Sequence, residues 1–217
     1  MAPSVRVNSD WLTLLGRSPV RLAVVIVALA PLVRLIAGVP LGWLGVNPLE
    51  YLIRATGEWT LIMLALTLSV TPLRRLTGWS VLHRYRRTFG RLTFVYGLTH
   101  FTVYLVFDMG LDWGDILRDI PKRPFITVGF TAFVLLSLLA VTSSDAAIRA
   151  LGARRWRLLH RAVYAIALLG VVHYLWLVRA DISKPLMYGA IFAVLFTLRI
   201  VWAWKRSVQP PGHAGPS

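Results

Sequence analysis

The chain has 217 residues, of which 57% are hydrophobic and 15% are charged. A water-soluble protein of this size could not bury so many apolar side chains, so the composition excludes a soluble enzyme and a disordered chain. The 24 Lys and Arg against 9 Asp and Glu could suggest nucleic-acid binding, but these charges lie between long apolar runs. We therefore predict an integral membrane protein that contacts lipid and binds no nucleic acid. The absence of Cys leaves His or carboxylate as metal ligands.

Six apolar stretches have a length near that needed to cross about 30 Å of hydrocarbon as a helix. They are residues 22–36, 59–73, 92–107, 125–141, 158–178 and 185–204. Pro31 and Arg34 interrupt the first stretch, and a basic start followed by a short apolar run also describes a signal peptide. We keep it as a helix because no A-x-A-like cleavage site follows Ile36. The predicted fold class is an all-α integral membrane protein, a bundle of six transmembrane helices.

The distribution of Lys and Arg predicts the orientation of this bundle, since short loops rich in these residues stay in the cytoplasm. The two ends and the second and fourth connections carry more than twice as many as the other side. Both termini should therefore be cytoplasmic, with a cytoplasmic segment at 1–21, the six-helix domain at 22–204 and a disordered tail at 205–217. The acidic connection at 108–124 lies on the opposite side, as a docking surface for a partner or as a solvated link.

Three of the five His, namely His100, His160 and His173, lie in predicted spans, where an ionisable side chain is costly and points to function. Gly97 and Gly170 each precede a His by three residues. A haem needs an axial imidazole and space beside the helix for its macrocycle, which a glycine provides. The alternative is that these glycines only let two helices approach, with the His hydrogen-bonded across the contact.

His160 and His173 are separated by 13 residues, or about 20 Å along a helix, which suits two stacked haems. On an ideal helix the two rings would point about 140° apart, so two stacked haems would require some unwinding or a rotamer adjustment. Two other classes of protein use intramembrane His. A proton-coupled transporter of small molecules would be expected to show inverted repeats and paired broken helices, which are not evident here. A structural scaffold would use the His as hydrogen-bond partners, and it would be colourless.

Three segments carry a resemblance to a known family. They are RRTFGRLTFVYGLTH from Arg86 to His100, WRLLHRAVY from Trp156 to Tyr164, and HYLW from His173 to Trp176. These segments resemble the ferric-reductase-like transmembrane superfamily and, within it, the MsrQ (YedZ) family. The likeness covers nearly the whole chain.

The resemblance implies an electron-transfer subunit of the bacterial inner membrane that carries haem b, one or two per chain, and binds flavin mononucleotide (FMN). Electrons would come from menaquinol or ubiquinol, or from a reduced flavin. They would pass to a periplasmic molybdenum enzyme, MsrP, which reduces methionine sulfoxide and so repairs oxidised periplasmic proteins. The substrate chemistry would belong to that partner, so no catalytic residue is expected in this chain.

The resemblance also implies a ligand set. His100 and His173 would bind the haem nearer the periplasm, while His160 would bind a second haem alone or with a ligand other than His. Larger relatives have another His on the third span, at a position where this chain has Arg86. This arginine cannot bind iron well because it stays protonated, but it could pair with a haem propionate. Its alternative role is positive-inside topology. Tyr104 and Tyr164, each four residues after a candidate ligand, could line a haem pocket or simply pack.

Overall fold

The computed structural model describes residues 18–178 and 180–208, and every regular element in these ranges is helical. The predicted segment before Ser18 and the predicted tail beyond Val208 lie outside the described residues. The elements in chain order are α2 (Ser18–Gly38), α3 (Pro48–Thr77), η1 (Ser80–Leu82), α4 (His83–Val103), η2 (Tyr104–Asp108), α5 (Trp113–Lys122), α6 (Pro124–Val141), α7 (Asp145–Leu151), α8 (Ala153–Leu159), α9 (Ala162–Leu177) and α10 (Ser183–Val208).

Five of the described helical segments are long and apolar enough to cross a membrane on their own. The remaining predicted span, the third, passes the same test only together with α5, from which it is bent by 116°. Four arginines in the first turns of α4 explain this result, because they lower the mean hydropathy of the segment. The prediction of an all-helical membrane bundle is thus confirmed, with five or six spans in the described residues.

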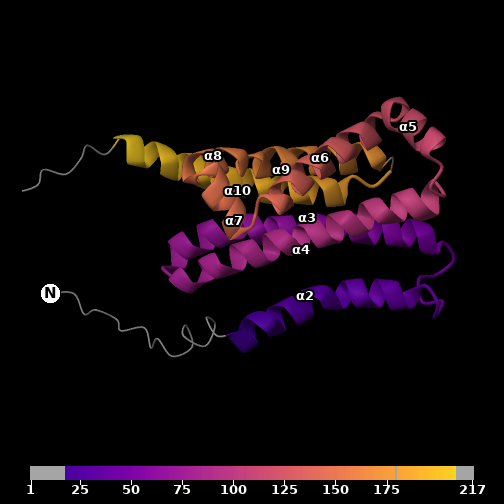
Figure 1. Ribbon diagram of the computed structural model, residues 1–217, viewed down its shortest axis with the longest axis horizontal. Helices are drawn as coiled ribbons and strands as arrows, with labels where there is room; N and C mark the ends of the chain where they lie inside the picture. The colour runs from indigo at the N-terminus through magenta and orange to yellow at the C-terminus, as the bar shows by residue number, and fades with distance from the viewer. Residues whose placement is uncertain (1–17, 179, 209–217) are drawn as a thin grey trace, which may run out of the picture.

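The helices form an elongated bundle in which α2 lies at one side, α3 and α4 in the middle, and α6, α8, α9 and α10 at the other side (Figure 1). α2 begins and α10 ends at the same end of the bundle, and α5 lies at the opposite end (Figure 1). The two ends of the described chain therefore lie at one end of the bundle, and that both face the same side of a membrane stays a prediction. That this side is the cytoplasm stays a prediction from the charge distribution.

α3 begins eleven residues before the apolar run that predicted it. Asn47 caps the helix by accepting a hydrogen bond from the Glu50 backbone N–H at 3.2 Å, and Pro48 occupies the first helical position. Arg54 and Glu50 form an ion pair at 2.6 Å one turn apart. The N-cap, the proline and the ion pair let α3 begin well before the apolar run. Its first turns lie at the same end of the bundle as α5 (Figure 1).

The connection at 108–124 is folded rather than extended. Its helix α5 is capped by Asp112, whose side chain accepts from the Asp115 N–H at 3.0 Å. Before α5, Tyr104–Asp108 form a π-helical turn that ends the third span. Wide turns of this kind are frequent at functional sites.

The fifth span is broken at His160. α8 ends at Leu159 and α9 begins at Ala162, so His160 and Arg161 lie between two helical segments of one span. The break lies at His160 itself, where ligation of two haems by His160 and His173 would require either unwinding or a rotamer adjustment. The connection before α8 is tied to the start of α4, because Arg87 donates to Asp145 at 2.7 Å. This bond holds the pKa of Asp145 below its ordinary value.

Arg199 of α10 satisfies a backbone carbonyl that a proline leaves free. Pro72 has no N–H, so the Leu68 carbonyl four residues earlier in α3 lacks its usual helical donor. The Arg199 guanidinium donates to this carbonyl and also, at 2.5 Å, to the hydroxyl of Tyr164. α3, α9 and α10 are therefore joined by a polar contact inside their shared apolar core.

α2 is held to the bundle by a cluster of apolar residues and by one hydrogen bond across helices. The fully buried Tyr96 of α4 donates its hydroxyl to the Ala28 carbonyl of α2 at 2.7 Å. We expect Tyr96→Phe to lower the stability of the detergent-solubilised protein by about 0.6–1.7 kcal/mol, as for other hydrogen bonds between membrane helices. Thermal unfolding measures this effect. The exposed Tyr51 is the matched control, and equal loss in Tyr51→Phe would contradict the assignment.

Candidate functional site

His100 of α4 reaches across to α3 and is held there by a backbone carbonyl. Its Nδ1 atom donates to the Ile53 carbonyl at 3.0 Å, with the Thr56 hydroxyl at 3.3 Å. Because a carbonyl only accepts, the proton of the neutral ring lies on Nδ1. The Nε2 atom then keeps a free lone pair, which is the form in which imidazole binds a metal.

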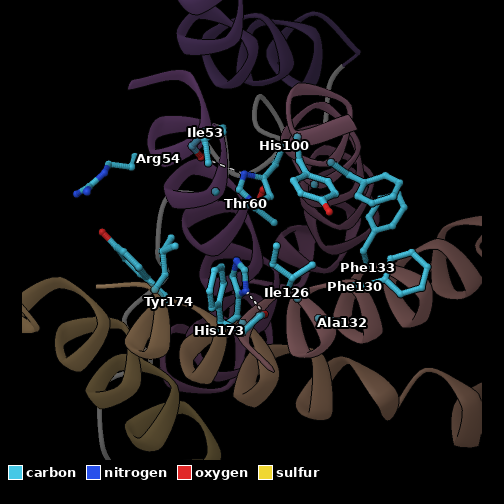
Figure 2. Close-up of a pocket in the computed structure, with 18 of the residues that line it drawn as sticks. Ile53, Arg54, Thr60, His100, Ile126, Phe130, Ala132, Phe133, His173 and Tyr174 are labelled. Atoms are coloured by element: carbon cyan, nitrogen blue, oxygen red, sulfur yellow. Dashed lines mark hydrogen bonds between the residues drawn. The ribbon is translucent and has the colours of Figure 1, made fainter. Parts of the chain in front are cut away.

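His173 of α9 is held in the same way by α6. Its Nδ1 atom donates to the Phe125 carbonyl at 2.6 Å. Within the described part of the chain, neither His100 nor His173 has a hydrogen bond at Nε2. Two helix pairs, α3 with α4 and α6 with α9, therefore present one imidazole each, with the proton and the lone pair in the same arrangement (Figure 2).

A glycine on the neighbouring helix makes room for each ring. An added Cβ at Gly57 would lie 3.2 Å from the His100 ring, and one at Gly129 would lie 2.6 Å from His173 Nδ1. Each glycine follows the acceptor carbonyl by four residues, one helical turn, so the ring lies over the glycine while it bonds the preceding turn. Neither glycine was predicted from the sequence, because each lies on a different span from the His that it accommodates.

The two rings face one cavity. Their centroids are 6.1 Å apart and their planes meet at 80°. The cavity has a volume of about 500 Å³ and lies between α3, α4, α6 and α9. Phe101 and Phe133, stacked with centroids 4.4 Å apart, form part of one wall, and Phe130 packs against Phe101. Figure 2 shows both imidazoles with Phe130 and Phe133 around the same space. The walls around the two imidazoles are thus mainly apolar.

The predicted Gly97 and Gly170 line this cavity, and each also lies at a close contact between helices. An added Cβ at Gly97 would lie 2.9 Å from Leu136, and one at Gly170 would lie 3.0 Å from Leu61. The close contacts agree with the alternative that these glycines let two helices approach, while space for a haem beside them stays a prediction. These two glycines let helices approach, whereas Gly57 and Gly129 make room for the imidazoles themselves.

His160 lies in a different setting, at the end of the bundle where α10 ends. Its ring stacks on Trp156 with centroids 4.1 Å apart. Its Nε2 atom is 3.2 Å from the Thr142 hydroxyl, and Trp156 donates to the Thr142 carbonyl at 2.8 Å. The structure does not bring His160 to the cavity that holds His100 and His173, in agreement with the prediction of two separate positions.

Arg86 interacts electrostatically with His160 and with Arg199. In the described residues no carboxylate lies within 4.0 Å of either arginine. Arg199 was not predicted as a site residue, although Pro72, four residues after Leu68, was a signal for a free carbonyl in α3. Tyr164, for which the sequence left open a haem pocket or simple packing, accepts a hydrogen bond from Arg199 and so belongs to this polar group.

Polar groups gather at the mouth of the cavity, toward α5. Glu58 lines the cavity and accepts from Lys184 at 2.8 Å and from Tyr188 at 3.3 Å. No role for Glu58 was predicted from the sequence. Tyr104, for which the sequence left open a haem pocket or simple packing, lines the cavity and donates to Asp119 of α5 at 2.9 Å.

The donor set fits a haem. The imidazole nitrogens of His100 and His173, which come from opposite helix pairs, would hold the iron of a haem. The apolar walls with stacked aromatic rings suit a flat macrocycle, and the polar mouth suits its carboxylates. The matched Nδ1 bonds to carbonyls are the usual support of metal-binding His.

Comparisons with known proteins agree with this geometry. The family described as "Ferric reductase like transmembrane component" matches residues 56–171, a range that contains His100 and His160 and ends two residues before His173. The class is therefore that of ferric-reductase-like membrane proteins. No solved structure matches the chain.

Curated relatives narrow the class further. The chain is 50% identical over 192 residues to a protein of Ralstonia nicotianae, with 88% of each chain covered. It is 47% identical over 194 residues to one of Herminiimonas arsenicoxydans, covering 88% and 89%, and 46% identical over 186 residues to one of Rhodospirillum rubrum, covering 86% and 89%. Each of these is named "Protein-methionine-sulfoxide reductase heme-binding subunit MsrQ". The chain belongs to the MsrQ family.

Proposed function

We propose that this chain is the haem-binding membrane subunit of a methionine sulfoxide reductase system, and that a haem b lies between His100 and His173. The observation that carries the proposal is the matched pair of imidazoles, each with Nδ1 on a carbonyl and each facing the same cavity. The names of the relatives support it, because they describe haem-binding subunits of such a system.

The residues of the chain have separate tasks in this proposal. The Ile53 and Phe125 carbonyls keep the proton of each imidazole on Nδ1, which leaves Nε2 for the metal and makes the ring a stronger base. The aromatic wall around Phe101 packs against the macrocycle and excludes water, which lowers the dielectric around the site. A bound haem supplies reversible one-electron chemistry at its iron. Two His ligands suit electron transfer rather than oxygen binding.

The proposal places the chain in the bacterial inner membrane with the α5 end of the bundle in the periplasm. Electrons would come from menaquinol or ubiquinol, or from reduced flavin through bound FMN. They would leave to a periplasmic molybdenum-dependent reductase like MsrP. The positive-inside distribution of Lys and Arg supports this orientation. It puts the His100–His173 cavity close to the side on which the reductase would bind.

His160 would form a second position for electron transfer near the opposite side. Its location beyond the break of the fifth span, next to Arg86 and close to Trp156, supports this assignment. Arg86 would pair with a haem propionate there, since it has no carboxylate partner in the part of the chain that the structure describes. Arg199 adds a second guanidinium to the same end of the site.

An absorption difference spectrum tests the proposed function. We expect the detergent-purified protein from haem-replete cells to show a sharp low-spin b-type band on reduction with dithionite, and part of that band with a menaquinol analogue. A band with dithionite but none with the quinol would indicate that the electron donor is reduced flavin. A colourless protein would contradict the haem proposal and favour the transporter or scaffold.

A further inference from the structure

The junction between α5 and α6 consists of a single residue, Arg123. Its backbone N–H donates to the Asp119 carbonyl at 3.1 Å and so ends α5. Its own carbonyl accepts from the N–H groups of Ile126 at 2.9 Å and Thr127 at 3.2 Å and so begins α6. The position of Arg123 therefore sets the start of α6 relative to α5.

The Arg123 side chain reinforces this junction beside a candidate haem ligand. Its guanidinium donates to the Asp119 carboxylate and lies 4.0 Å from that of Asp108. It also lies over the Phe125 ring, with Cζ 5.7 Å from the ring centroid. The carbonyl of this same Phe125 is the acceptor that holds His173 Nδ1 at 2.6 Å.

Asp119 is connected to the other imidazole as well. It accepts from the Tyr104 hydroxyl at 2.9 Å, and Tyr104 follows His100 by one helical turn, at the start of the π-helical turn. Tyr104 and Arg123 both line the cavity. Asp119 on α5 thus bonds Tyr104, which follows His100, and Arg123, which precedes the Phe125 that holds His173.

We propose that Arg123 and Asp119 are positioning residues for His173, which hold the first turn of α6 so that the Phe125 carbonyl stays on Nδ1. This inference rests on the proposed haem between His100 and His173. The carbonyl raises the basicity of the imidazole, and a more basic ligand favours the oxidised iron. Loosening the junction therefore raises the midpoint potential of the haem, and movement of α5 reaches His173 through the Phe125 carbonyl.

The test uses the full-length protein with its haem, in detergent. Arg123→Gln and Asp119→Asn are compared with Arg118→Gln, which removes an exposed α5 arginine paired with Asp115 at 3.6 Å. The midpoint potential comes from a redox titration followed by the absorption band, and the ligand field comes from low-temperature electron paramagnetic resonance. We expect both junction variants to shift the oxidised-to-reduced equilibrium about tenfold, about 59 mV for one electron, toward the reduced form.

The controls separate positioning from a general loss of structure. Arg118→Gln should keep the wild-type potential, and the double variant should shift no further than either single one, since both remove one pair. Arg123→Lys keeps a cation for Asp119, so its potential should lie between those of the wild type and Arg123→Gln. If Arg123→Gln does not accumulate in cells, Arg123→Lys is measured in its place.

Two failures are distinguishable. Wild-type potentials and resonance spectra in Arg123→Gln and Asp119→Asn would overturn this inference and leave the haem proposal intact. A wild-type protein without haem would overturn the proposed function itself. A shift in Arg118→Gln as large as that in Arg123→Gln would also overturn the inference, because it would show a diffuse effect of charge on α5.

Discussion

Replacing His100 or His173 by Ala should remove one and the same haem signal from the purified protein. Both rings face one cavity with centroids 6.1 Å apart, and each is held with Nε2 free. Without either His the iron would keep a single imidazole. The spectrum would then change from low-spin to high-spin, or the haem would dissociate. We expect the reduced low-spin band of this haem to fall below a tenth of its wild-type intensity, since even changes to partners of metal ligands cost about 10–100-fold in affinity.

His160→Ala should leave this band intact, because His160 lies outside the cavity and its Nε2 atom is next to Thr142. His83→Ala is the matched control, since His83 is exposed and, among the residues that the structure describes, bonds only the nearby Ser80 carbonyl, at 2.9 Å. Absorption and electron paramagnetic resonance spectra of the four variants decide the result. A common signal lost in both His100→Ala and His160→Ala would contradict the pairing and require another register of the third and fifth spans.

Much of the bundle was predictable because its signals are local. Apolar runs of near-membrane length predicted the spans, and the G-x-x-H pattern predicted that His100 and His173 share a function. The helix in the 108–124 connection was predictable too, although we expected only a loop. Trp113, Ile116, Leu117 and Ile120 have the spacing of an amphipathic helix, with Asp112 as its N-cap.

The support of the site could not be read from the sequence, because it depends on contacts between helices. Gly57 and Gly129 stand alone on their spans, and only the packing of α3 on α4 and of α6 on α9 places them under the imidazoles. The acceptors are backbone carbonyls of Ile53 and Phe125, whose residue types carry no signal for this role. The contacts that run from Asp119 through Arg123 and Phe125 to His173 likewise depend on how α5 packs on α6.

Gly129→Ala should weaken haem binding by displacing a ligand. The added Cβ would lie 2.6 Å from His173 Nδ1, a distance that requires the ring or the helix to move. The nearby Nδ1 bond to Phe125 would lengthen, and the ligand would lose its support. We expect a loss of about 10–100-fold in haem affinity, measured by haem titration of the apoprotein and by the intensity of the low-spin band.

Alanine variants of two other glycines are the comparisons for this prediction. Gly57→Ala meets the His100 ring at 3.2 Å and should have a smaller effect, while Gly189→Ala meets only Val171 at 3.5 Å, an ordinary contact, and should bind haem as the wild type does. All three glycines lie within helices, where Ala is favoured over Gly by about 0.8–1.0 kcal/mol, so backbone propensity does not explain a difference among them. An order other than Gly129, Gly57, Gly189 would show that contact with the imidazoles does not determine haem binding.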